Sequence, residues 1–123
     1  MSGLEYLLDT NVVISLLKDK EFFEEVDLSR DTLVARCCVS QITRMELLSF
    51  PSITKDDEVQ VARFLSAVRI ILLDEQIEAV AIALRREKRL KLPDAVIAAS
   101  ARVFGLKLLT LDTRLRNAVG GPH

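Results

Sequence analysis

Four short apolar segments are spread along the chain, and stretches of helical character separate them. The apolar segments span residues 4–8, 32–39, 70–73 and 106–110. Their length and their content of branched residues favour buried β-strands. Strands joined by helical crossovers run parallel, and both faces of a parallel sheet need cover. The pattern predicts an α/β protein, a three-layer α/β/α sandwich around a mainly parallel sheet of about four or five strands.

The segments between these strands carry start and stop signals of helices. Residues 10–18 are apolar enough for a packed helix, and residues 21–26 suggest a further short one. N-cap residues precede three later helices, at Ser40, Thr54 and Asp74. A helix that is apolar nearly all round begins at Pro93 and ends at Gly105. Residues 112–117 predict a short final helix or turn.

Length and composition narrow the class of protein. The chain has 123 residues, of which 50% are hydrophobic, and its formal net charge is −1. These values predict one domain over residues 1–123 with a packed core, and a flexible tail over residues 118–123. A near-neutral charge excludes a polybasic nucleic-acid binder, but it leaves nucleic acid open as a substrate. No segment resembles a signal peptide or a membrane span, so we expect a cytoplasmic protein.

Two cysteines, Cys37 and Cys38, are adjacent within the second predicted strand. Side chains of adjacent strand residues point to opposite faces, which makes a disulfide between them geometrically poor. No histidine lies nearby to complete a zinc site. We therefore expect two small buried hydrophobic side chains.

Four carboxylates stand among apolar residues that predict burial. Asp9 ends the first predicted strand and Asp112 follows the last, while Glu46 shares a helix face with Ile42 and Met45. Asp94 shares its helix face with Ile97, Ala98 and Ala101. Each acid alone could be a helix cap, a first-turn acid or a surface residue. In open α/β sheets, however, ligands bind at the carboxyl ends of strands, so Asp9 and Asp112 would converge if their strands are neighbours.

Several buried carboxylates need positive charge, because burying one unpaired carboxylate costs several kcal/mol. These segments offer no matching set of buried Lys or Arg. A divalent cation supplies the charge, and oxygen ligands without His or Cys suit Mg²⁺ or Mn²⁺ better than Zn²⁺. Acidic clusters with one or two such ions activate water and hydrolyse phosphodiesters.

The chain resembles the PIN-domain ribonucleases, and among them the VapC-type toxins of prokaryotic toxin–antitoxin pairs. The resemblance rests on LLDTNVVI (7–14), Glu46, LKLPDAVIAASA (90–101) and LLTLD (108–112), and it covers nearly the whole chain. It implies a PIN-like fold and RNA cleavage that depends on Mg²⁺ or Mn²⁺. One departure is Leu115, which stands where many such toxins have Phe.

The resemblance also assigns roles to individual residues. Asp9, Glu46 and Asp94 match the family's invariant acids, and Asp112 matches its usual fourth. We expect Asp9, Asp94 and Asp112 to bind metal and all four acids to be catalytic. Thr10, Asn11 and Thr110 match positions that support the site.

We expect an endoribonuclease in which a metal-activated water attacks phosphorus in line, as a two-metal mechanism implies. The products would carry 3′-hydroxyl and 5′-phosphate ends. VapC-type toxins usually dimerise and bind an antitoxin whose tail covers the acidic site. We therefore expect an RNA substrate, a VapB-like antitoxin and a homodimer.

Basic residues lie in two groups near the predicted site. Arg85 and Arg86 begin a run of cations that ends at Lys91, and Arg114 and Arg116 follow Asp112. They could contact RNA phosphates, or the first group could simply complement a helix C-terminus. Aromatic residues are few, and no motif indicates a base-stacking platform.

Two other functions remain open at this point. The chain could be a PIN-domain nuclease of RNA processing without a toxin role. A receiver-like signalling domain could instead use Asp74, which follows the third predicted strand, as its phospho-acceptor. Such a domain needs paired acids after its first strand, where this chain has Asp9 followed by Thr10 and Asn11.

Overall fold

A parallel sheet lies at the centre of the computed structural model, which describes residues 3–19 and 33–120. The strands are β1 (Tyr6–Leu8), β2 (Cys37–Ser40), β3 (Arg69–Ile71) and β4 (Lys107–Leu109). Their order is β3-β2-β1-β4, and every neighbouring pair is parallel. The first three strands follow one another toward one edge of the sheet, and β4 then lies on the other side of β1. The order therefore reverses between β1 and β4, which are neighbours although they lie at opposite ends of the described sequence.

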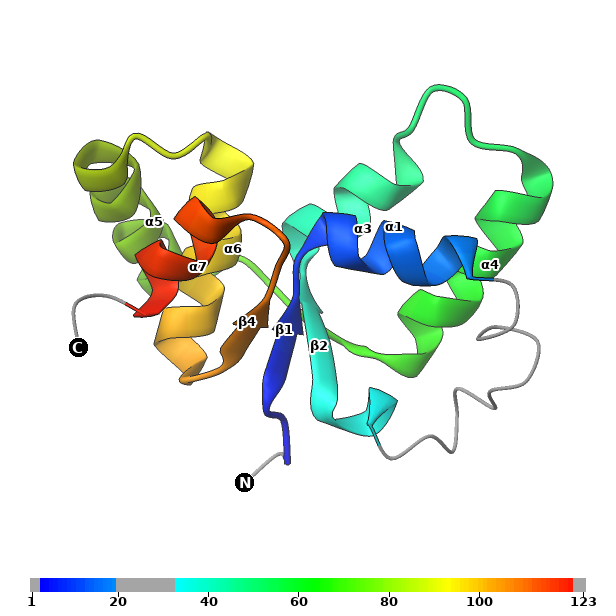
Figure 1. The fold of residues 1–123 in the computed structure, drawn as a ribbon, viewed down its shortest axis with the longest axis horizontal. Helices are drawn as coiled ribbons and strands as arrows, with labels where there is room; N and C mark the ends of the chain where they lie inside the picture. Colours follow the sequence, from blue (N-terminus) through cyan, green and yellow to red (C-terminus); the bar gives the residue numbers. More distant parts are fainter. Residues whose placement is uncertain (1–2, 20–32, 121–123) are drawn as a thin grey trace.

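Helices cover both faces of this sheet (Figure 1). One face carries α1 (Thr10–Lys18), α3 (Gln41–Leu48) and α4 (Lys55–Ala67), and the other carries α5 (Glu75–Lys88), α6 (Leu92–Phe104) and α7 (Thr113–Gly120). Each face has its own hydrophobic cluster, with Phe64 and Val13 buried in the first and Ile77 and Ile97 in the second. The predicted three-layer α/β/α fold is confirmed.

The strands alternate between the two clusters, as the two-residue period of a strand requires. Leu7 and Cys38 belong to the cluster beneath α5 and α6, whereas Leu8 and Cys37 belong to the cluster beneath α1 and α4. Both cysteines are buried and neither is in a disulfide, and burial raises the pKa of the Cys38 thiol to about 12. The expectation of two small buried side chains within the strand is therefore confirmed.

The predicted N-caps lie where the sequence indicates. Ser40 Oγ accepts a hydrogen bond from the backbone N–H of Ile42, and Asp74 Oδ1 accepts one of 2.8 Å from Ile77 N–H. Thr54 and Asp57 form a reciprocal capping box at the start of α4. Asp74 thus has a structural role as a helix cap.

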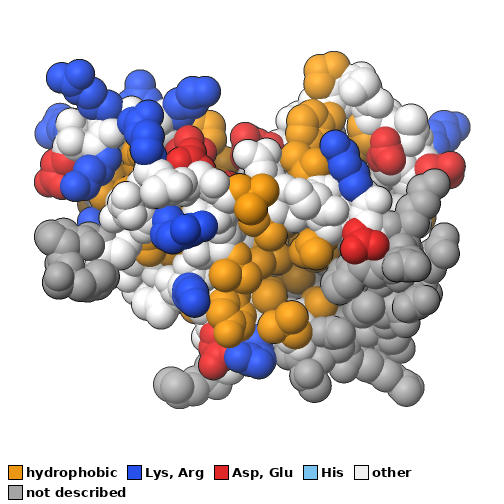
Figure 2. All heavy atoms as spheres, in the orientation of Figure 1, with side chains coloured by type: hydrophobic (Ala, Val, Ile, Leu, Met, Phe, Trp, Pro, Cys, Tyr) orange, Lys and Arg blue, Asp and Glu red, His pale blue; other side chains and the backbone are white. Residues whose placement is uncertain are grey.

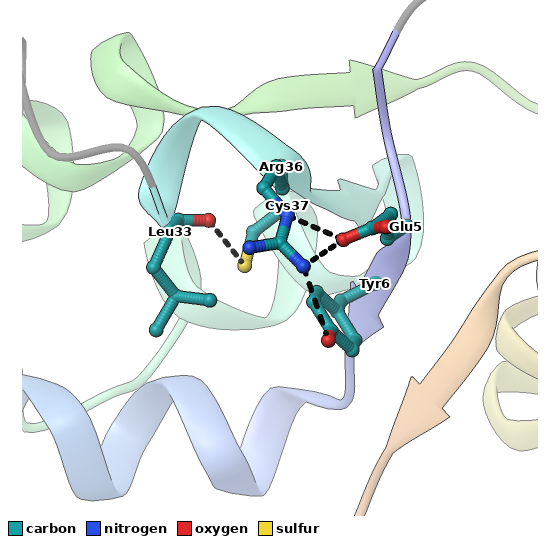
Figure 3. Close-up of polar contacts among 5 residues, drawn as sticks. All are labelled: Glu5, Tyr6, Leu33, Arg36 and Cys37. Atoms are coloured by element: carbon teal, nitrogen blue, oxygen red, sulfur yellow. Dashed lines mark hydrogen bonds and ion pairs between the residues drawn. The ribbon is translucent and has the colours of Figure 1, made fainter.

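The start of the second strand was predicted too early. Val34–Arg36 form a 3₁₀ turn, and β2 begins only at Cys37; Thr32 lies outside the described residues. The turn bonds Arg36 N–H to the Leu33 carbonyl, and the Arg36 side chain then reaches Glu5 and Tyr6 (Figure 3). Its guanidinium pairs with Glu5, which raises the pKa of Arg36, and it lies 5.4 Å from the centre of the Tyr6 ring. These contacts hold the amino end of β2 against β1.

The remaining differences concern segment ends. The predicted helix at residues 21–26 lies outside the described residues, as does the tail from residue 121. The final helix continues to Gly120, so residues 118–120 are helical, and Ala118 is buried. Leu115, the departure from the family pattern, is also fully buried in the core. Within the described ranges, no helix is long and apolar enough to cross a membrane.

Candidate metal centre

The carboxyl ends of β1 and β4 meet at the point where the strand order reverses. Leu8 of β1 pairs with Leu109 of β4, and the backbone N–H of Asp9 donates a 3.0 Å hydrogen bond to the Leu109 carbonyl. Asp9 and Thr110 therefore leave the sheet side by side. This is the place at which open α/β sheets bind ligands.

Asp9 is buried, with 5% of its surface exposed, and both of its carboxylate oxygens are held. Oδ1 accepts a 2.8 Å hydrogen bond from the backbone N–H of Thr10, and Oδ2 accepts one of 2.6 Å from the Thr110 hydroxyl. The Thr110 hydroxyl in turn accepts a hydrogen bond from the backbone N–H of Asp112. The carboxylate orientation is thus fixed by the start of α1 and by the segment after β4.

A second hydrogen-bonded chain fixes Glu46, which lies on α3. The Thr10 hydroxyl donates a 2.7 Å hydrogen bond to Glu46 Oε1 and lies 2.9 Å from the hydroxyl of Thr43. A hydroxyl has only one hydrogen to donate, so Thr43 must donate to Thr10. Thr43 is completely buried. Thr43 therefore orients Glu46, one turn later in α3, through the hydroxyl of Thr10.

Three of the predicted acids face one open cavity of about 340 Å³. Asp9 enters it from the end of β1, Glu46 from α3 and Asp94 from the first turn of α6. Thr10 and Asn11, the predicted supporting residues, also line this cavity. In Figure 2, acidic side chains border a notch between the lobe of α5–α7 and the lobe of α1, α3 and α4.

Asp94 shows the electrostatic consequence of this arrangement. Its pKa is raised, first by burial and then by the negative charges of Asp9, Asp112 and Glu46, while Lys91 opposes the shift. Asp94 is therefore close enough to the other three predicted acids for their charges to disfavour its ionised form.

The prediction of burial is fully confirmed for Asp9 alone, because Glu46 and Asp94 are only half-buried, and it was wrong for Asp112. It is exposed and does not line the acid cavity. Its Oδ1 accepts hydrogen bonds from the backbone N–H groups of Arg114 and Leu115, as an N-cap does at the start of α7. Apolar neighbours in the sequence failed as a guide here because Leu111 also points to solvent, with 75% of its surface exposed.

The donor set suits a hard divalent ion, since the cavity presents carboxylate oxygens and neither His nor Cys. Within residues 3–19 and 33–120, however, no three Asp, Glu, His or Cys side chains lie close enough to hold one ion together. An ion here would therefore take fewer than three direct protein ligands in this arrangement of side chains. Mg²⁺ commonly binds through one or two carboxylates and keeps several of its waters, so the residues fit such an ion.

The predicted basic residues lie on the lobe formed by α5 and α7, where Lys and Arg side chains gather in Figure 2. Arg85 and Arg86 are exposed in the last turn of α5. Arg114 reaches the backbone carbonyl of Lys88 at 3.3 Å, and Arg116 donates a 2.7 Å hydrogen bond to the carbonyl of Thr110. Arg116 is thus attached to the segment that also holds Asp9.

Sequence reasoning missed several residues of the site. Phe50 lines the acid cavity, and so does Ile14 one turn beyond Thr10. Met45 was expected on the face of Glu46, but 57% of its surface is exposed, and Thr43 and Leu47 are the buried neighbours. Thr43 could have been identified from the sequence, because residues three apart on a helix are neighbours and Thr43 precedes Glu46 by three.

A larger cavity of about 880 Å³ lies beside β4 and is lined by apolar residues with Arg102, Lys107 and Arg116. None of the predicted acids lines it. The cavity that holds the acids is therefore not the larger of the two, and it is identified by its carboxylates rather than by its volume.

Comparison with known proteins agrees with the fold. No curated protein matches the chain. A toxin–antitoxin complex from Klebsiella pneumoniae contains a similar structure with 33% identity and a TM-score of 0.68, covering 89% of this chain and 88% of that one. DNA-bound VapBC from Salmonella typhimurium is similar with 27% identity and a TM-score of 0.65, covering 84% and 83%. PAE2754 from Pyrobaculum aerophilum, at 18% identity, a TM-score of 0.71 and coverage of 97% and 87%, shares the fold.

The family assignment follows from a match that spans almost the whole described structure. The profile of the PIN domain covers residues 6–120, from the first residue of β1 to the last of α7. The chain belongs to the PIN domain family.

Proposed function

We propose that this protein is a divalent-metal-dependent endoribonuclease. The observation that carries the proposal is the single cavity that Asp9, Glu46 and Asp94 share, with hydroxyl groups holding two of these carboxylates in place. Membership of the PIN domain family supports nuclease activity. RNA as the substrate and the need for Mg²⁺ or Mn²⁺ belong to the proposal.

Asp9 and Asp94 would hold the central ion, and Glu46 and Asp112 would complete its surroundings through water. One or two ions bound there would lower the pKa of a water ligand and neutralise the scissile phosphate. Burial and then repulsion by the neighbouring acids raise the pKa of Asp94, and this supports the role, because a divalent cation relieves the repulsion. The hydrogen bonds from Thr110 to Asp9 and from Thr10 to Glu46 keep the acceptor oxygens oriented.

The reaction is a hydrolysis of the RNA backbone. The oxygen of water forms a bond to phosphorus as the bond from phosphorus to the 3′-oxygen breaks. The leaving 3′-oxygen takes up a proton, so the products carry a 3′-hydroxyl and a 5′-phosphate. The proton that the attacking water loses would go to a carboxylate that does not bind the ion directly, and Glu46 is the acid of the cavity that remains for this role.

A biological role as a toxin follows from the similar proteins rather than from the site. The Klebsiella chain belongs to a toxin–antitoxin complex and the Salmonella chain to VapBC. We propose that this chain is the toxin of such a pair, that a VapB-like antitoxin binds it, and that it forms a homodimer. Arg85, Arg86, Arg114 and Arg116 would contact RNA phosphates.

Purified protein and end-labelled single-stranded RNA test the nuclease proposal. We expect cleavage with Mg²⁺ or Mn²⁺, none with EDTA, and none by the Asp9→Asn variant. Cleavage that persists in both controls would contradict the mechanism. Growth arrest on expression, relieved by an antitoxin encoded beside the gene, tests the toxin role separately.

A further inference from the structure

A second cavity adjoins the acid cavity on the side of α1, α3 and α4. Its volume is about 300 Å³, which lies at the lower end of the range of small-ligand sites. Its walls are mostly apolar and include Leu17, Leu47 and Val61. Ile14 and Phe50 line both this cavity and the acid cavity, so the two are neighbours.

One wall of this second cavity carries an unsatisfied polar group. Gln60 lines the cavity, and its Oε1 is buried without a hydrogen-bond partner. Across residues 3–19 and 33–120, it is the one buried side-chain nitrogen or oxygen in this state. Such groups are rare in folded proteins and call for an explanation, for example an absent ligand. The terminal torsion of Gln is broad, so the carboxamide can rotate toward the cavity.

We propose that this cavity receives an unstacked RNA base that carries an exocyclic amino group, adjacent to the phosphate that the acids cleave. The inference rests on the proposed function and extends it to substrate selection. The amino group of the base would donate to Gln60 Oε1. Adenine fits best, because a Gln carboxamide can accept from its N6 amino group and donate to its N7.

The walls suit a base, because proteins read single-stranded RNA by packing unstacked bases against aromatic and apolar side chains. Phe50 is available for this, with 43% of its surface exposed at the border of the two cavities. Lys18 lines the same cavity and can approach a flanking phosphate. The acid there, Asp57, is engaged with the backbone N–H of Thr54 in the capping box of α4.

Short oligoribonucleotides in which single adenosines are replaced by purine riboside test this proposal. Purine riboside lacks only the amino group. Equilibrium binding is measured with Ca²⁺ in place of Mg²⁺, and cleavage is measured with Mg²⁺. We expect replacement at one position beside the cleaved bond to weaken binding to the wild-type protein by roughly 5- to 100-fold, the range of one good base contact.

Gln60→Leu and Gln60→Met should bind both oligonucleotides equally, because neither side chain can receive the amino group. Both variants should fold, since they remove an unsatisfied buried group, and their Tm should equal or exceed that of the wild type. The matched control is Gln76→Leu, a change at an exposed position on α5. It should keep the full preference for adenosine.

Two outcomes would overturn the proposal. One is a wild-type protein that is indifferent to the amino group at every position. The other is a preference for adenosine over purine riboside that survives in both Gln60 variants. If the preference survives and those variants weaken binding of a VapB-like antitoxin, the cavity receives a protein side chain instead of a base. Preferential binding without cleavage in any divalent ion would contradict the nuclease function and leave the base site standing.

Discussion

The hydroxyl of Thr110 donates a 2.6 Å hydrogen bond to Oδ2 of Asp9, although 101 positions separate the two residues. The bond joins the ends of β1 and β4, and it is buried. It therefore serves both the fold and the site: it satisfies a buried carboxylate, and it fixes the direction in which that carboxylate faces the cavity.

Replacing Thr110 by Val keeps the shape of the side chain and removes this bond. We expect Thr110→Val to lower the free energy of unfolding by about 1–3 kcal/mol, the usual cost of an unsatisfied buried group. Loss of such an orienting contact typically weakens metal affinity by about 10- to 100-fold. Denaturant unfolding and metal titration measure the two effects. Thr110→Ser, which retains the hydroxyl, should stay near the wild type in both.

Divalent metal should stabilise the folded protein, because the ion binds a cluster of carboxylates that exists only in the folded state. At a free concentration of 100 times the Kd, binding adds about 2.7 kcal/mol to the free energy of unfolding. Thermal unfolding with increasing Mg²⁺ or Mn²⁺ should show a saturable rise in Tm. The rise should be largely absent in Asp9→Asn, and an equal rise in that variant would place the ion elsewhere.

Asp94→Asn should raise the Tm of the metal-free protein at neutral pH while abolishing cleavage. The folded state raises the pKa of Asp94, so the ionised carboxylate disfavours folding at any pH above that raised pKa. Asn removes the charge, and the gain is fully present there. As the pH falls through the raised pKa, wild-type Asp94 takes up a proton and the difference between the two proteins shrinks. Thermal unfolding in EDTA across this pH range checks the sign, and a difference that grows on acidification would contradict it.

Arg114→Ala should weaken RNA binding uniformly across sequences and reduce the slope of log Kd against log salt by about 0.7–1. Arg114 lies past the carboxyl end of β4, on the lobe that carries the basic side chains. Lys107→Ala is a suitable control, because Lys107 begins β4 and lies at the opposite end of the sheet. An equal loss in both variants would show that the two cations act only through the total charge.

Local signals explain why much of the fold was predictable. Ser40, Thr54 and Asp74 cap helices through contacts within a few residues, and α1 spans residues 10–18 as expected. The start of β2 was not predictable in this way, because Arg36 bends toward Glu5 and Tyr6, which are distant in sequence. β-branched composition cannot indicate a turn that is held by such tertiary contacts.

In the candidate site, too, residues marked by local signals were predictable and those placed by tertiary packing were not. Asp9 and Asp94 follow from a strand end and a helix start, which the sequence marks locally. The contact of Asp9 with Thr110 required β1 and β4 to be neighbours, and only the strand order shows this. Phe50 and Gln60 were not identified because they meet at a cavity between helices, and that cavity depends on how α1, α3 and α4 pack.

The pairing of β1 with β4 also sets the moment at which the site can exist during synthesis. Asp9 leaves the ribosome early, yet its partner Thr110 is added about a hundred residues later, close to the carboxyl end of the last strand. A nascent chain that has formed β1, β2 and β3 still lacks one side of the acid cluster's support. Protein synthesis must therefore pass β4 before any copy can fix Asp9 in place, so a chain that ends before β4 carries Asp9, Glu46 and Asp94 without this support.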